Sequence, residues 1–98
     1  MRMMMKVSVP IEAANRAMQD GHMSRILQEQ LEKLRPEGVY FFAEDDARTA
    51  LLFIDVKDAS DLVVIADPFF QGMNARIRFT PVMNAQDFQT GLTKLAAS

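Results

Sequence analysis

The sequence predicts an α+β domain built around a four-stranded antiparallel sheet. Apolar residues alternate or recur at helical spacing in the order strand, helix, strand, strand, helix, strand, helix. The two middle strands are joined by a short polar connection at residues 44–47, which indicates a hairpin. The chain has 98 residues, 49% of them hydrophobic and 24% charged, which is ordinary for one globular domain. We therefore expect a single domain over residues 1–98.

The N-terminal third predicts a strand followed by a broken helix. Residues 3–9 alternate in the pattern of a half-buried strand, and Pro10 suits the first turn of a helix. Helical spacing then extends over residues 11–34 in two stripes, Ile11, Ala14 and Met18, then Met23, Ile26 or Leu27, Leu31 and Leu34. Asp20-Gly21 lies between the stripes and predicts a kink or a short break. Arg35-Pro36 ends the helical region, because a residue before proline is pushed out of the helical conformation.

The middle of the chain predicts a hairpin and a second helix. Residues 38–44 and 48–56 are rich in aromatic and branched side chains, which favour strands. Asp58 is the expected cap of the next helix. The apolar stripe of that helix is Leu62, Ile65, Ala66 and Phe69. Pro68 is expected either to kink this helix or to end it.

The last quarter of the chain predicts a fourth strand and a closing helix. Residues 74–82 form the strand, and Asn84 is the expected cap of the helix. The closing helix carries Phe88, Leu92 and Leu95 at helical spacing. The complete order of elements is that of a ferredoxin-like fold, βαββαβ with a C-terminal helix. It predicts the strand order four, one, three, two, with both crossover helices on one face of the sheet.

Alternation along the strands sorts their side chains onto two faces. The face that the helices should cover is almost wholly apolar: Met5, Val7, Val9, Val39, Phe41, Ala43, Ala50, Leu52, Ile54, Val56, Ile77 and Phe79. We call the opposite side the open face: Met4, Lys6, Ser8, Tyr40, Phe42, Glu44, Thr49, Leu51, Phe53, Asp55, Arg76, Arg78, Thr80 and Val82. Apolar patches of this kind on soluble proteins usually mark contacts. We expect a second copy of the chain to cover the open face, giving a homodimer; the alternative is that the closing helix folds back over it.

Composition excludes several classes of partner. The net charge is −2 and the basic residues are scattered, so we expect no nucleic-acid partner. There is no cysteine, hence no disulfide, thiolate nucleophile or Cys-ligated zinc. Lys6 interrupts the first apolar run without a cleavage site, which argues against a signal peptide, and no stretch approaches the ~20 apolar residues of a membrane span. We expect a soluble, cytoplasmic protein with no membrane partner.

His22 is the default candidate for a general base, because it is the only side chain in the sequence whose unperturbed pKa lies near neutrality. The alternative is a surface histidine beside Gly21. His22 has no histidine or cysteine partner, so we expect no metal. No phosphate-binding loop or dinucleotide fingerprint occurs either, and we expect no cofactor.

A second group of candidates lies on the open face. Arg78 and Tyr40 are suited to orienting a carboxylate or phenolate, because guanidinium binds planar anions bidentately. The remaining ligand-binding candidates are Phe42, Phe53 and Arg76. The alternative is that the arginines form intersubunit salt bridges around an apolar patch. Residues 68–70 and the many methionines either line a pocket for a flat apolar ligand or belong to the core.

Three short motifs resemble small uncharacterised families of the dimeric α/β-barrel superfamily. They are Val-Ser-Val-Pro at residues 7–10, Ala-Asp-Pro-Phe-Phe at 66–70 and Phe-Thr-Pro-Val-Met at 79–83. The resemblance implies two ferredoxin-like subunits packed sheet to sheet around a joint barrel. The superfamily includes isomerases, cofactor-independent monooxygenases and heme proteins. The chain departs from the heme members, because it has no Trp and its only His lies in the first helical segment.

These observations lead to two functional hypotheses. The first is a homodimeric protein that binds a small, largely apolar organic ligand or serves an oligomerisation role. The alternative is a cofactor-independent isomerase or monooxygenase acting on a phenolic or lactone-like substrate. In the alternative, Tyr40, Arg78 and His22 would orient the substrate and move protons.

Overall fold

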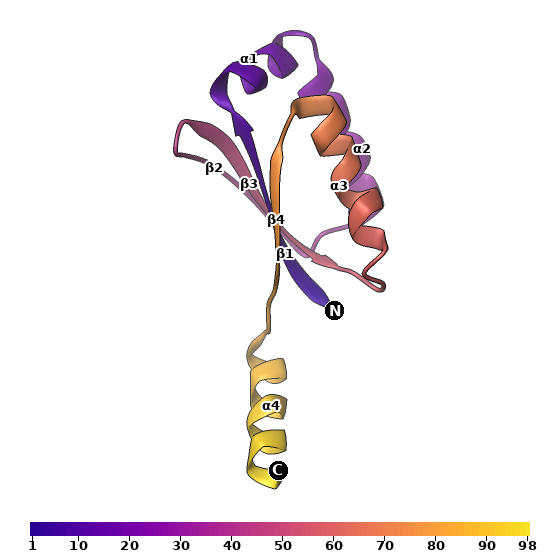
Figure 1. Cartoon of the computed structure of the whole chain (residues 1–98), viewed down its shortest axis with the longest axis vertical. Coiled ribbons are helices and arrows are strands. Elements are labelled where there is room, and N and C mark those ends of the chain that lie inside the picture. The colour runs from indigo at the N-terminus through magenta and orange to yellow at the C-terminus, as the bar shows by residue number, and fades with distance from the viewer.

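The computed structural model describes residues 1–98, and its elements follow the predicted order (Figure 1). The elements are β1 (Arg2–Pro10), α1 (Ile11–Gln19), α2 (His22–Leu34), β2 (Gly38–Glu44), β3 (Ala47–Asp55), α3 (Asp61–Met73), β4 (Arg76–Pro81) and α4 (Ala85–Ala97). The four strands form one sheet in the order β2-β3-β1-β4, and every neighbouring pair is antiparallel. This confirms the predicted α+β class and the ferredoxin-like strand order.

The register of the sheet confirms the predicted division into two faces. Met5 of β1 lies between Leu52 of β3 and Phe79 of β4, and all three belong to the face that carries the helices. The next residue, Lys6, lies between Leu51 and Arg78 on the open face. Because successive side chains point to opposite sides of a sheet, these pairings also assign all the remaining strand residues to one face or the other.

The break in the first helical region is confirmed. α1 ends at Gln19 and α2 begins at His22, with Asp20 and Gly21 between them. Gly21 has a φ of 81°, a left-handed conformation that glycine adopts without steric cost. The chain therefore turns between the two helices, and the apex of this turn lies at the end of the molecule opposite α4 (Figure 1).

Several predicted boundaries are wrong by a few residues. Asp58 does not cap α3: its carboxylate accepts a hydrogen bond from the Ser60 N–H at 3.4 Å, within the loop before the helix. α3 continues through Pro68 to Met73. Asn74 then has a φ of 51° and caps α3, so β4 begins at Arg76 rather than at residue 74. At the hairpin, β3 begins at Ala47, because Ala47 pairs with the last residue of β1.

The core lies between the sheet and the three helices α1, α2 and α3. Its largest fully buried side chains are Met5, Leu52 and Phe69. The expectation that the helices cover the whole of their face is wrong at β2, where Phe41 is 61% exposed. In Figure 1 the hairpin of β2 and β3 curves away from α2 and α3, as the right-handed twist of a sheet requires for an edge strand.

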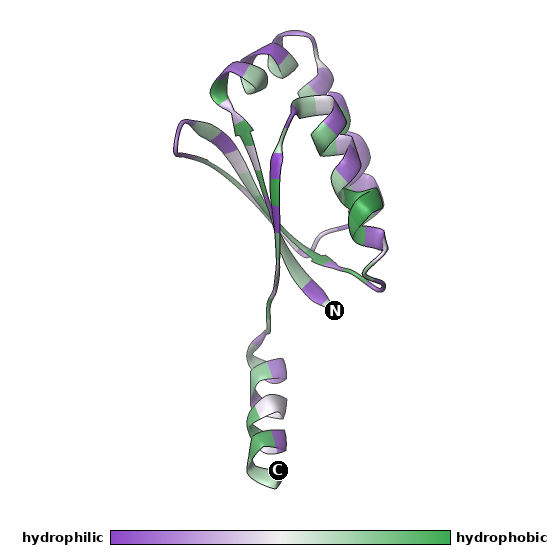
Figure 2. Cartoon of the chain, in the orientation of Figure 1, coloured by the Kyte–Doolittle hydropathy of each residue, from purple (hydrophilic) through white to green (hydrophobic).

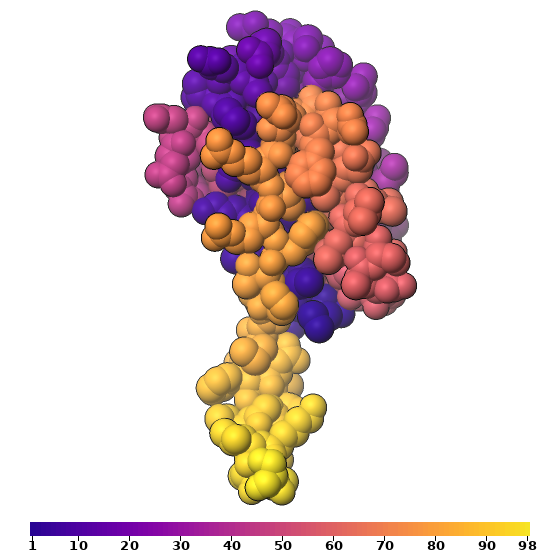
Figure 3. Space-filling view, in the orientation of Figure 1, coloured from indigo at the N-terminus to yellow at the C-terminus, as the bar shows by residue number.

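The closing helix does not fold back over the sheet of its own chain, so that alternative is wrong for a single copy. Figure 3 shows α4 as a separate projection beyond the end of the sheet. None of its residues is buried, and the molecule measures 55 × 26 × 18 Å. The predicted cap is confirmed, since the Asn84 side chain and Asp87 form a reciprocal capping box.

Gly72 permits close packing of α3 on α2, and this contact leads to a first prediction. A Cβ atom at Gly72 would lie 2.1 Å from Cδ1 and 3.3 Å from Cγ1 of Ile26, whose side chain is buried. We expect Gly72→Ala to lower the free energy of unfolding by about 1–2 kcal/mol, because overpacking outweighs the gain in helix propensity. Urea denaturation measures this, with Gly91→Ala as control, since nothing lies within 4 Å of Gly91. Equal midpoints for the two variants would contradict the contact.

Candidate functional site

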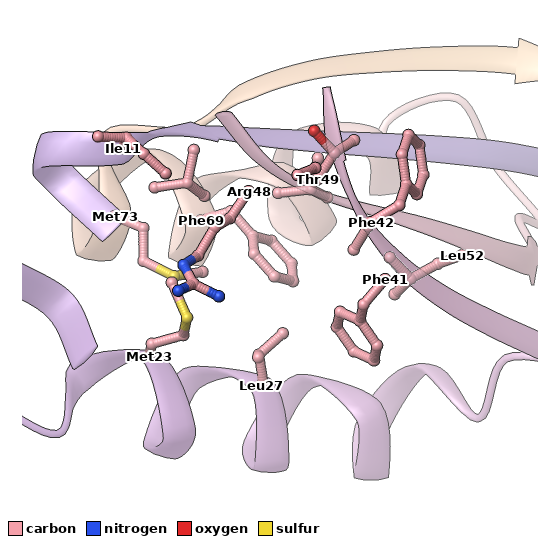
Figure 4. A pocket seen from close by; sticks show the side chains of 14 residues that line it. Ile11, Met23, Leu27, Phe41, Phe42, Arg48, Thr49, Leu52, Phe69 and Met73 are labelled. Atoms are coloured by element: carbon pink, nitrogen blue, oxygen red, sulfur yellow. The ribbon is translucent and has the colours of Figure 1, made fainter. Parts of the chain in front are cut away.

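An apolar cleft of about 490 Å³ lies between α2, α3 and the β2–β3 end of the sheet (Figure 4). Twelve of the fourteen residues that line it are hydrophobic. Met23 and Leu27 face it from successive turns of α2, and Phe69 and Met73 from successive turns of α3. Phe41 of β2 closes the side where the hairpin curves away from the helices. The cleft therefore exists because the sheet twists out from under α2.

Arg48 is the one charged residue among those that line this cleft. It pairs with Val9 of β1 and Ala43 of β2, which places its side chain on the helix side of the sheet. Figure 4 shows its guanidinium directed into the cleft on the side of Met23 and Met73. Arg48 takes part in none of the six ion pairs of the structure. Arg48 is itself exposed, so an anion that reaches the cleft can pair with its guanidinium.

A second, polar cleft of about 270 Å³ lies on the open face. Arg76 and Arg78 line it, and neither forms an ion pair. Lys6 also lines it but is paired with Glu44 at 3.0 Å. Thr49 is 3% exposed, and its Oγ1 is buried without a hydrogen-bond partner. The intersubunit salt bridges that are the alternative for the two arginines involve a second copy of the chain and stay a prediction.

The residues proposed as a site from the sequence lie in separate parts of the chain. Tyr40 and Phe53 contact each other edge to face, with ring centroids 6.5 Å apart. Tyr40 and Arg78 lie in the same row of the open face but on opposite edge strands, so three strand spacings of roughly 4.8 Å separate them. Phe42 lines the apolar cleft, whereas Phe53 does not.

His22 is remote from this group. It begins α2, where its backbone N–H donates to Asp20 Oδ1 at 3.1 Å and its Nδ1 lies 2.9 Å from the same oxygen. Its side chain is 46% exposed, and it lines none of the three clefts that we describe. His22 is therefore placed as a surface histidine beside Gly21, which was the alternative to a role as general base.

Two further charge clusters lie around a third cleft of about 310 Å³ at the other end of the sheet. Hydrogen bonding to Glu37, and then the charges of Glu37 and Asp87, raise the pKa of the Arg2 guanidinium. Hydrogen bonds from the Met1 ammonium and from Lys57 lower the pKa of Asp55. Arg2 is half-buried and the other groups are exposed, and all of them are paired, which is typical of surface ion pairs rather than of catalytic groups.

Sequence reasoning missed Arg48 and the exposed position of Phe41. Arg48 lies two residues before Ala50 in β3, so alternation alone places a single cation on the otherwise apolar helix side. Of the two interpretations of residues 68–70 and the methionines, the core is confirmed for Phe69 and Met73, which are buried and border the cleft from below, and Met23 lines the cleft beside them. No group of three or more His, Cys, Asp or Glu side chains is placed to hold a metal ion. None of the helices has the length and apolar character that crossing a membrane requires.

The cleft and its single cation are thus the features that a function has to explain. Comparison of the chain with protein-family models, with curated proteins and with solved structures finds no match in any of the three. The resemblance to the dimeric α/β-barrel superfamily stays a prediction, and the fold is ferredoxin-like at the level of topology.

Proposed function

We propose that this protein is a homodimer that binds a small, largely apolar organic ligand in the cleft between α2, α3 and the sheet. The observation that carries this proposal is the cleft itself, whose volume is about 490 Å³ and whose lining is hydrophobic at twelve of fourteen positions. Ligand pockets usually have volumes of about 300–1,000 Å³ and apolar walls with a few polar groups. A dedicated ligand site is the function that best accounts for these two properties together.

Arg48 suggests the chemistry of one end of the ligand. A carboxylate could form two parallel hydrogen bonds with the guanidinium while its hydrocarbon part lies against Leu27 and Phe41. Met23 beside Arg48 would adapt to different hydrocarbon shapes, because its side chain is unbranched, flexible and only partly buried. We therefore infer that the ligand is an apolar acid, such as a fatty or aromatic carboxylic acid.

Self-association is supported by the open face. Tyr40 is 64% and Phe42 38% exposed, and they adjoin Leu51 and Phe53 in the register of β2 and β3. Monomeric proteins rarely expose a contiguous patch of this kind. A second copy of the chain is the partner that we propose for it.

The enzymatic alternative has weaker support. His22, Tyr40 and Arg78 lie at the apex of the helices and at the two opposite edges of the sheet. A reaction that uses them would need a second copy to bring Tyr40 close to another chain's Arg78. The binding function needs only side chains that already line one cleft.

Binding of decanoate tests the proposed function directly. Titration calorimetry at pH 7 should give saturable binding with one decanoate per chain. Leu27→Trp should weaken it at least about tenfold, because the indole fills the cleft, and neither of the two polar clefts has comparable apolar walls. The control is Val63→Trp, which places the same side chain at a position of α3 that is 73% exposed.

Two results would contradict the proposal. One is the absence of saturable heat with decanoate, with decanol and with an aromatic acid such as naphthoate. The other is equal weakening by Leu27→Trp and Val63→Trp, which would show that the ligand binds somewhere other than the cleft. Static light scattering of the same samples reports self-association, for which twice the mass of one chain is expected.

A further inference from the structure

α4 is an amphipathic helix that nothing in its own chain covers. Phe88, Leu92 and Leu95 recur at the spacing of one helical face and are 55%, 42% and 71% exposed. Figure 2 shows green, hydrophobic positions on α4, although the helix projects free of the domain. An apolar stripe on an isolated helix indicates that the helix normally packs against another surface.

The shape of the chain supports the same conclusion. Its radius of gyration is 15.7 Å, whereas a compact chain of this length has a value of about 12.5 Å. The difference arises from α4, which extends the molecule along its longest axis (Figure 1). Helices shorter than about 12–15 residues are marginal in water without tertiary contacts, and α4 has 13 residues. A stable α4 therefore needs a partner surface.

The start of α4 is held in the projecting direction. The Val82 N–H donates to the Arg2 carbonyl at 3.2 Å, and the Arg2 guanidinium pairs with Asp87 at 2.8 Å. The capping box of Asn84 and Asp87 defines the first turn of the helix. Folding α4 back over the sheet of its own chain would require a reversal within the short link at residues 82–84 and would break the Arg2–Asp87 pair. The partner surface is more readily supplied by another molecule.

We propose that two copies of the chain exchange their closing helices, so that α4 of each copy packs across the open face of the other. The apolar stripe from Phe88 to Leu95 is about 10 Å long at the rise of an α-helix. On the sheet, Tyr40 and Phe42 lie two residues apart on β2, beside Leu51 and Phe53. That patch spans roughly 7–13 Å along the strands, a length similar to that of the stripe.

The two contacts of such a dimer are equivalent, so the assembly stops at two copies. Each copy has one uncovered helix and one uncovered sheet patch, so two copies related by a two-fold axis satisfy both and leave neither exposed. The exchange rests on the self-association proposed above but not on the ligand, because the apolar cleft is lined mainly from the helix side of the sheet and shares only Phe42 with the patch. It also explains why two unpartnered apolar surfaces occur on one small chain.

Variants on each side of this contact provide the first test. Leu92→Asp on the helix and Phe53→Arg on the sheet should each weaken the dimer roughly thirtyfold or more, as buried contact residues do. Light scattering across a concentration series measures this. Thr90→Asp is the matched control, since it adds the same charge to the face of α4 opposite the stripe. Leu92→Asp lies on an exposed helix, so its result can be interpreted even if Phe53→Arg does not fold. A monomeric wild-type chain, or a Leu92→Asp dimer as tight as wild type, would overturn the proposal.

Disulfide trapping identifies which surfaces meet, since the chain has no cysteine of its own. Leu92→Cys and Leu51→Cys are made as separate proteins, refolded together and oxidised. We expect a covalent dimer with a bond between positions 92 and 51, identified by mass spectrometry. Thr90→Cys mixed with Leu51→Cys should give at least tenfold less. A wild-type dimer without the 92–51 bond would overturn the exchange while leaving self-association intact. A third protein carries both Leu51→Cys and Leu92→Cys in one chain. An intramolecular 92–51 bond in a monomer of this protein would show that α4 folds back on its own sheet and would likewise overturn the exchange.

Discussion

Replacing Phe69 with alanine is expected to lower the free energy of unfolding by about 3–5 kcal/mol. Phe69 is 0% exposed, and its ring packs in the core between α3 and the sheet. The loss combines the transfer free energy of the ring with the cost of the cavity that remains. Small domains have a total stability of only about 5–15 kcal/mol, so this variant is expected to be partly unfolded near physiological temperature.

The neighbouring residue supplies a matched control for this prediction. Phe70 lies next to Phe69 on the same helix but is 47% exposed. Phe70→Ala should therefore cost well under half as much as Phe69→Ala in urea denaturation followed by circular dichroism. If Phe69→Ala does not fold at all, Phe69→Leu gives a smaller loss that can be measured. Equal losses at the two positions would mean that α3 does not present Phe69 to the core.

The second large effect concerns the ligand. Arg48→Gln is expected to weaken decanoate binding by about ten- to a hundredfold, because hydrogen bonds to charged groups contribute about 1.5–3 kcal/mol. Binding of decanol should change little, since the alcohol has no charge to lose a partner. The difference between the two ligands, measured by calorimetry at pH 7, isolates the role of the guanidinium from that of the apolar walls.

Arg78→Gln is the control for charge. It removes a positive charge from the open face, on the other side of the sheet from the apolar cleft. We expect no effect of Arg78→Gln on either ligand. Equal weakening by Arg48→Gln and Arg78→Gln would show that the acid responds to the overall charge of the protein. Greater weakening by Arg78→Gln would place the acid in the polar cleft of the open face, as the sequence suggested for Arg78.

The two clefts differ in how far the sequence could predict them. Period-two alternation put Arg76 and Arg78 on one face, and the register confirms that both line the polar cleft there. The same alternation put Phe41 on the helix side, but it cannot tell whether a helix reaches that far. Coverage depends on the position of α2 relative to an edge strand, and the twist of the sheet sets that position.

The sequence by itself determined the order of the elements, the break at Gly21, the strand order and the two faces of the sheet. These features follow from local conformation and from side-chain periodicity, which act over a few residues at a time. Only the tertiary structure decided that β2 curves away from α2 to leave a cleft beside Arg48, and that α4 projects from the domain. Both depend on how rigid elements are placed relative to one another, and that placement results from sheet twist and from a few contacts between residues distant in sequence, such as Arg2 with Asp87.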